Sequence, residues 1–362
     1  MWNVVYLLGF LGSFLLSIFF TPFSGKIARK FNIIDIPSER KIHKVPTPLL
    51  GGLGIFLSIL ATVLLGILFV RLNIIFLQLK IYIPGIIQSL PKLLLILSIG
   101  FIVVLFGIFD DIFHLKPFVK LSLQIFVSIA LFFSGIKISL FIPNNFISFI
   151  ITTGWVIFMM NSFNLLDNMD GLSAGVSLIS GFILFIFAVQ MGQLFVSTLL
   201  SVFLGAISGF LIYNFPPAKI FMGESGSSFL GFFLATISII ITFYKYETTN
   251  PYLPIFAPLV IFSVPFFDTI SIIWIRKKRK LPIFKADKNH ISHRLVNLGM
   301  NKKQAVIFIY FLTICTGLGA LLMKNLNIWG CLIIIIQVII ILSIVGILEL
   351  VGRKNGKFNN IS

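Results

Sequence analysis

Apolar runs of roughly 20 residues recur along almost the whole chain, and each is long enough to cross a bilayer as an α-helix. Because 58% of the 362 residues are hydrophobic and only 11% are charged, an ordinary soluble globular protein is excluded. The sequence therefore predicts an all-α polytopic membrane protein, with one integral membrane domain over residues 1–350 and a short basic tail over 351–362. We predict eleven spans, at residues 3–21, 49–70, 93–109, 118–134, 146–164, 172–190, 194–214, 226–243, 253–275, 304–323 and 329–350.

The charged residues predict the orientation of these spans. Of the 28 Lys and Arg residues, 22 fall in one set of loops and in the tail, which the positive-inside rule assigns to the cytoplasm. The N-terminus is then outside and the C-terminus cytoplasmic. Ten of the eleven acids lie on the same cytoplasmic side, and because acids contribute little to topology, they indicate a site there. The predicted cytoplasmic loops are 22–48, 110–117, 165–171, 215–225 and 276–303.

The stretch 161–175, NSFNLLDNMDGLSAG, joins two predicted spans and carries two acids. Asp167 and Asp170 are three residues apart, and Asn164 precedes them. An ionisable group at a membrane boundary is costly and indicates function. The alternative is an Asn- and Gly-rich turn with two solvated carboxylates.

A second pair of acids ends the third predicted span, in FDDIFHLKPFVKL. Asp110 and Asp111 are adjacent, so on a helix they diverge by about 100° and favour two roles, one near a metal and one near a substrate phosphate. Lys120 follows and could bind a phosphate. The alternative is an interfacial helix end with snorkelling lysines.

Glu224 opens the eighth predicted span, where free helix amides suit an anion or a carboxylate-held metal, although a simple capping turn is also possible. The loop 276–303 contains His290, His293 and Arg294. Without a third His or Cys nearby they favour a pyrophosphate over zinc, and a solvated basic loop is the alternative. Asp268 needs a partner inside its span, whether structural or in the site.

The first cytoplasmic loop brings Lys44 and Thr47 to the start of the second span, either as a hinge or as part of a site. Carboxylates from several loops thus meet a basic loop on one membrane face. Carboxylates with phosphate suit Mg²⁺, with Mn²⁺ as the alternative ion. Together these features predict phosphoryl transfer at the membrane surface. The net charge of +17 lies between the spans, so we expect anionic lipid or a phosphorylated substrate as partner, and no nucleic acid.

Five blocks resemble, in order, those of the polyprenyl-phosphate N-acetylhexosamine-1-phosphate transferases, glycosyltransferase family 4. The blocks are PTPLLGG, FDDIFHLKPFVKL, NSFNLLDNMDGLSAG, NFPPAKIFMGESGSSFLG and FKADKNHISHRLVNLG. The resemblance implies transfer of a sugar 1-phosphate from a UDP-sugar to undecaprenyl phosphate, with release of UMP, at the start of cell-envelope polysaccharide synthesis. It leaves a homodimer open.

The resemblance also implies roles for individual residues. Asp110 and Asp111 would form the aspartate pair, with Asp110 engaging the lipid phosphate. Asp167 and Asp170 are implied as further catalytic residues. The implied substrate-binding residues are Lys44, Thr47, Lys120, Asn164, Asn214, His290, His293 and Arg294, and the implied metal ligands are Asp111, Asp167 and Glu224.

One departure from the family pattern concerns Glu224, because the family normally has aspartate there, in G-D-x-G-S. The extra methylene of glutamate moves a bound metal unless the backbone retreats. If this is a metal position, an aspartate at 224 is expected to keep or raise activity. The segment HISHRL resembles the GlcNAc-1-phosphate branch, so GlcNAc is the expected sugar, with GalNAc or a deoxy-aminosugar open.

Several alternatives stay open. The related UDP-MurNAc-pentapeptide phosphotransferases are one, and a proton-coupled transporter is another, which the gathering of acids at one face disfavours. A CDP-alcohol phosphotransferase is excluded, because Gly175 stands where that motif needs arginine. A lipid phosphate is largely dianionic at pH 7 and needs no strong base, so direct attack on the donor is expected, with a phospho-aspartyl intermediate as the rival.

Overall fold

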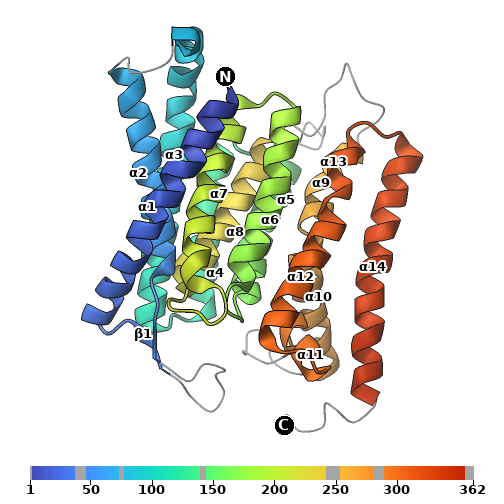
Figure 1. Ribbon diagram of the computed structural model, residues 1–362. Helices are drawn as coiled ribbons and strands as arrows, with labels where there is room; N and C mark the ends of the chain where they lie inside the picture. The colour runs from blue at the N-terminus through green and yellow to red at the C-terminus, as the bar shows by residue number, and fades with distance from the viewer. Residues whose placement is uncertain are drawn as a thin grey trace.

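A computed structural model describes residues 2–36, 46–72, 77–138, 144–241, 253–280 and 289–354, and it is a helical bundle (Figure 1). The helices are α1 (Trp2–Lys30), α2 (Gly51–Arg71), α3 (Ile83–Phe113), α4 (Pro117–Phe133), α5 (Asn145–Leu166), α6 (Leu172–Gln190), α7 (Leu194–Asn214), α8 (Gly223–Ile240), α9 (Ala257–Ile261), α10 (Ser263–Lys278), α11 (Ile291–Asn297), α12 (Lys302–Gly317), α13 (Gly319–Met323) and α14 (Ile328–Lys354). Two 3₁₀ segments, η1 (Leu77–Tyr82) and η2 (Leu253–Phe256), precede α3 and α9.

The described part of the chain contains nine helices that are long and apolar enough to cross a membrane. They coincide with nine of the eleven expected spans, and the chain is a multi-pass membrane protein. The fourth expected span is α4, which has only 17 residues. The ninth, expected as one helix over 253–275, is broken into η2, α9 and α10, with the junction between the two helices at Phe262. The assignment of each side of the membrane stays a prediction.

Two helices are longer than their apolar runs. α1 continues through Pro22 to Lys30, and α3 begins at Ile83, ten residues before the expected start at 93, and contains Pro91. Hydropathy marks only the segment that suits hydrocarbon, whereas a helix can continue beyond it, because its backbone groups bond within the segment. The first loop, which is predicted to be cytoplasmic, therefore starts after Lys30 instead of at residue 22.

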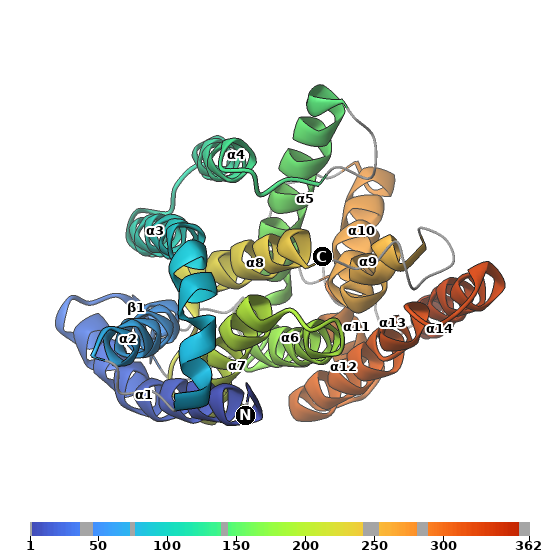
Figure 2. The same cartoon turned by 90° about the horizontal axis from the view of Figure 1, so that it is seen from above.

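α7 and α8 form the middle of the bundle. Seen along the bundle, α8 is surrounded by α2, α3, α5 and α6, and α1 packs most extensively on α7 (Figure 2). α14 lies at the outer edge beside α12 and α13 (Figure 2). The first residues of α1 and the last residues of α14 lie at opposite ends of the bundle, as an odd number of crossings requires (Figure 1).

A short two-stranded ribbon lies at one end of the bundle. β1 (Ile34–Asp35) pairs antiparallel with β2 (Thr47–Pro48), just before α2 begins. The Pro48 carbonyl accepts a 2.9 Å hydrogen bond from the Phe221 amide, which fixes the ribbon against the segment that leads into α8. At this end α1, α3, α5 and α7 finish while α2, α6 and α8 start (Figure 1).

Candidate active site

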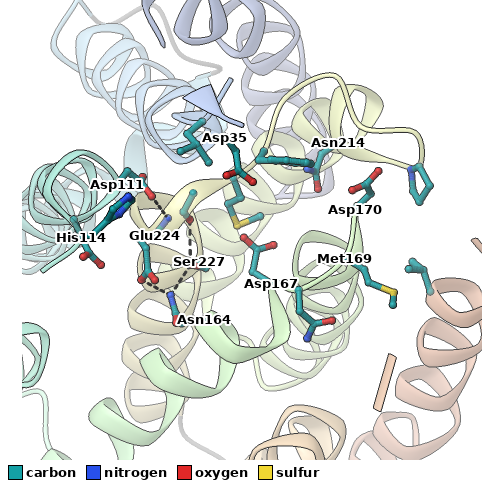
Figure 3. A pocket seen from close by; sticks show the side chains of 18 of the residues that line it. Asp35, Asp111, His114, Asn164, Asp167, Met169, Asp170, Asn214, Glu224 and Ser227 are labelled. Atoms are coloured by element: carbon teal, nitrogen blue, oxygen red, sulfur yellow. Dashed lines mark hydrogen bonds between the residues drawn. The ribbon is translucent and has the colours of Figure 1, made fainter. Parts of the chain in front are cut away.

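A cavity of about 580 Å³ opens at the end of the bundle where the two-stranded ribbon lies. Six of the chain's eleven acids line it, which confirms the clustering expected from the sequence. They come from β1, from the end of α3, from the turn between α5 and α6, and from the start of α8 (Figure 3). The acids are Asp35, Asp110, Asp111, Asp167, Asp170 and Glu224.

Asp110 is buried and holds the start of α4 against the end of α3. Its Oδ1 accepts a 2.8 Å hydrogen bond from the Leu115 amide, and its Oδ2 lies 2.5 Å from the Lys120 ammonium. The same ammonium lies 3.0 Å from Oε1 of Glu224. Lys120 therefore bridges two carboxylates that belong to different helices. Both Asp110 and Lys120 line the cavity, and the lysine occupies one oxygen of Asp110.

Asp111 points the other way and caps α8, which agrees with the separate roles expected for adjacent acids. Its Oδ1 accepts a 2.8 Å hydrogen bond from the Glu224 amide, and Oδ2 lies 3.4 Å from the Ser225 amide. Gly107, one turn earlier, permits this approach, because a Cβ there would lie 2.2 Å from the Ser225 Cα. The anion at the start of α8 is thus the chain's own Asp111 carboxylate.

Glu224 is held by its side chain as well as by its backbone. Asn164, near the end of α5, donates from Nδ2 to Oε2 of Glu224 and to Oγ of Ser227 at 3.1 Å (Figure 3). With Lys120 on Oε1, both carboxylate oxygens of Glu224 have a donor. The side chain of Glu224 is therefore long enough to reach both donors.

Asp167 is the available carboxylate of the site. Within the described part of the chain its side chain accepts no hydrogen bond, and it lies among the residues that line the cavity (Figure 3). Burial, followed by the negative charges of three neighbouring carboxylates, raises the pKa of the Asp167 carboxyl to about 8. Those neighbours are Glu224, Asp111 and Asp170. A cation in the cavity would favour the ionised form of this group.

Asp170 and Asn214 also line the cavity, but both bind backbone groups. Oδ2 of Asp170 accepts a 2.9 Å hydrogen bond from the Ala218 amide. Asn214 accepts a 3.0 Å bond from the Gly171 amide and donates a 2.9 Å bond to the Ile220 carbonyl. These contacts join the turn between α5 and α6 to the segment between α7 and α8.

The structure separates the basic residues of the histidine loop. His293 lines the cavity, whereas His290 and Arg294 are buried and do not. His290 Nδ1 lies 3.0 Å from Oδ2 of Asp268, and Arg294 Nε lies 3.2 Å from Oε1 of Glu349 on α14. His293 and Arg294 are adjacent on α11, so their side chains point about 100° apart, and of the three residues only His293 lines the cavity. Binding of a pyrophosphate by all three residues stays a prediction, and Asp268 has the partner it requires.

Two further predicted site residues, Thr47 and Lys44, come from the first predicted cytoplasmic loop. Thr47 is buried in β2 and is not among the lining residues. Lys44 lies outside the described residues. In the other direction, several polar residues that line the cavity were not predicted as site residues: Asp35, His114, Asn168, Ser227 and Lys302. Asp35 had a signal, as one of the acids on the basic side.

The carboxylates line one cavity without forming a ready metal cage. In the described ranges, no three His, Cys, Asp or Glu side chains are gathered to hold an ion. Two of the three expected ligands, Asp111 and Glu224, already accept hydrogen bonds at both oxygens. An ion here would need most of its ligands from water or from substrate.

Comparison with known sequences decides the family. A *Bacillus subtilis* protein described as a probable undecaprenyl-phosphate N-acetylglucosaminyl 1-phosphate transferase is 33% identical over 357 residues, which cover 96% of this chain and 93% of that protein. Residues 93–242 also match the profile of glycosyl transferase family 4. The chain belongs to glycosyl transferase family 4. The matched range begins within α3, ends two residues after α8 and contains five of the six acids of the cavity.

Other members of glycosyl transferase family 4 show the same similarity over most of the chain. A *Thermotoga maritima* undecaprenyl-phosphate α-N-acetylglucosaminyl 1-phosphate transferase is 28% identical over 83% of this chain and 92% of its own length. A *Mycobacterium leprae* decaprenyl-phosphate N-acetylglucosaminephosphotransferase is 29% identical over 84% of this chain and 80% of its own length. The family resemblance inferred from the five blocks is therefore confirmed.

Proposed function

We propose that the protein transfers N-acetylglucosamine 1-phosphate from UDP-GlcNAc to undecaprenyl phosphate and releases UMP. The relatives are named for polyprenyl-phosphate substrates and for N-acetylglucosamine phosphate transfer. The observation that carries the proposal is the bridge of Lys120 between Asp110 and Glu224 in an acid-lined cavity at one end of a membrane bundle. Such a cavity can receive a lipid phosphate and a nucleotide from the same membrane face.

The reaction proposed is a direct displacement. An oxygen of the lipid phosphate forms a bond to the β-phosphorus of the donor, and the bond from that phosphorus to the oxygen of UMP breaks. The acceptor is already largely dianionic at pH 7, so the chain needs no general base. Lys120, held in place by Asp110, would present positive charge to the phosphates. Asp110 then acts through the lysine, since its own oxygens are occupied.

We propose Mg²⁺ as the cofactor, with Asp167 as its principal protein ligand. The fit rests on the donor chemistry: Asp167 is a carboxylate without a hydrogen-bond partner among the described residues, in a cavity rich in negative charge. Mg²⁺ commonly binds one or two carboxylates and takes its other ligands from phosphates and water. When bound, it would neutralise charge that develops on the transferred phosphoryl group.

The test is UMP release by the purified protein in detergent with undecaprenyl phosphate and Mg²⁺. We expect release from UDP-GlcNAc that requires the lipid, and none when either substrate is omitted. Absence of UMP from every UDP-sugar tested would contradict the transferase function, and release only from UDP-MurNAc-pentapeptide would assign the other branch. Radiolabelled phosphate retained on the protein without acceptor would overturn direct displacement.

A further inference from the structure

The turn that carries Asp167 is held through the backbone of one glycine. Gly171 precedes α6 with a φ of +73°, a conformation that favours glycine. Its amide donates a 3.0 Å hydrogen bond to Oδ1 of Asn214, at the end of α7. Its carbonyl accepts a 2.5 Å hydrogen bond from the Tyr310 hydroxyl, on α12. Two helices that are distant in sequence therefore hold both backbone groups of the same residue.

The ring of Tyr310 fits against α6 only because a neighbouring position is glycine. A Cβ at Gly175, one turn after Gly171, would lie 2.0 Å from Cζ of Tyr310 and 2.1 Å from its hydroxyl oxygen. No side chain can share that space without moving the ring. Because Gly175 has no side chain, the Tyr310 ring can pack close to α6, and its hydroxyl then bonds to the turn.

Asn214, which binds the Gly171 amide, has both polar atoms of its side chain in hydrogen bonds. The side-chain amide of Asn214 uses its oxygen for Gly171 and its nitrogen for the Ile220 carbonyl. A second link runs in parallel, from the Ala218 amide to Oδ2 of Asp170. The segment 214–220 therefore holds the turn at two points, and Tyr310 holds it at a third.

We propose that Tyr310 and Asn214 are positioning residues that clamp Gly171 from both sides and so hold Asp167 toward the cavity. The inference rests on the proposed function, in which Asp167 would be the principal protein ligand of Mg²⁺. Tyr310 lies outside the five blocks that resemble the family, whereas Gly171 and Asn214 lie inside them. Because Asp167 accepts no hydrogen bond among the described residues, its position depends on the backbone of the turn. A turn that loosens would misplace this carboxylate without removing it.

The clamp can be tested without substrate by hydrogen–deuterium exchange of the full-length protein in detergent. Tyr310→Phe removes the hydroxyl and keeps the ring, and Gly175→Ala displaces the ring and keeps the hydroxyl. In both variants we expect the amides of residues 165–175 to exchange at least about two-fold faster than in the wild type, since the turn loses a hydrogen bond. Unchanged exchange in both variants would overturn the clamp.

Tyr213→Phe is the matched control. The Tyr213 hydroxyl donates a 3.1 Å hydrogen bond to the Ile18 carbonyl, so this variant also loses one bond between a tyrosine and a backbone carbonyl of another helix. That bond joins α7 to α1 and does not involve the turn. We expect a similar change in melting temperature for the two Tyr→Phe variants, but unchanged exchange of residues 165–175 in Tyr213→Phe.

Kinetics separate positioning from a structural role. For Tyr310→Phe we expect kcat/KM for UDP-GlcNAc to fall roughly five-fold, the scale of one neutral hydrogen bond, while KM for undecaprenyl phosphate changes less than about two-fold. Faster exchange with a kcat/KM equal to that of Tyr213→Phe would show that Tyr310 is only structural. A wild-type protein that releases no UMP from UDP-GlcNAc would refute the proposed function, and the exchange data would still decide whether the clamp exists.

Discussion

Shortening Glu224 tests whether this cavity is built around a glutamate. The family pattern has aspartate here, so Glu224→Asp would be expected to preserve activity if the position served only to bind a metal. The contacts predict the reverse. Removing one methylene withdraws the carboxylate by about 1.5 Å. The 3.0 Å contact with Lys120 would then exceed 4 Å, and the contact with Asn164 would also be lost.

The size of the loss follows from these two contacts. A hydrogen bond to a charged group contributes about 1.5–3 kcal/mol when buried. The side chains of Glu224 and Lys120 are 30% and 32% exposed, so screening by water reduces this value. With about 1 kcal/mol for each contact, Glu224→Asp loses about 2 kcal/mol, which corresponds to about a 30-fold fall in kcat/KM.

The assay is UMP release under donor-limited conditions, with a double-mutant cycle as the control. Asn164→Ala removes the partner of Oε2 and leaves Glu224 unchanged. If the shortened side chain acts by losing Asn164, the double variant should be less impaired than the product of the two single effects. Activity of Glu224→Asp at or above half the wild-type value, in protein of wild-type melting temperature, would refute the reasoning.

Three other variants and conditions test separate parts of the molecule. Asp167→Asn should lower UMP release more than about 100-fold, because an available charge is removed from the site. Membrane fractionation should show normal insertion of this variant. Turnover close to that of the wild type would contradict the assignment of Asp167 to the site. Glu349→Gln should destabilise the protein by about 1.5 kcal/mol, because buried Arg294 loses the nearer of two carboxylates and keeps Asp268 at 3.9 Å. Detergent unfolding should show this as a lower melting temperature, and an unchanged value would mean that the Arg294–Glu349 pair does not hold α14. Chelation with EDTA should abolish turnover, and added Mg²⁺ should restore it; full activity in EDTA would exclude the proposed cofactor.

Most of the fold could be predicted from hydropathy, because every backbone polar group in a bilayer must bond within its own helix. Hydropathy places nine spans correctly but cannot show where a helix continues past the hydrocarbon, as α1 does to Lys30. It also misses the break at Phe262. The segments on both sides of that residue are apolar, so no change in hydropathy marks the change of helix.

The acids of the site could be predicted for a different reason. Carboxylates are rare in this chain and costly near a membrane, so their positions carry information even without contacts. Their partners could not be predicted, because partnership depends on which helix ends meet. The sequence does not reveal that Asp111 caps α8, or that Arg294 contacts Glu349. It also does not reveal that, of the three basic residues, only His293 lines the cavity. Polar residues far apart in sequence need the packed bundle before they can be paired.

The charge balance of the cavity limits how it can bind its proposed substrates. Among the lining residues that the structure describes, six carboxylates face two lysines, a formal excess of four negative charges when the two histidines are neutral. Lys120 is shared between Asp110 and Glu224, so its single positive charge cannot by itself offset the charge of two phosphorylated substrates. Both proposed substrates carry phosphate and would add to the repulsion. The proposal of a divalent cation therefore rests on charge compensation more than on a preformed ligand cage. It also explains why the position of one available carboxylate, Asp167, needs to be fixed by Asn214 and Tyr310.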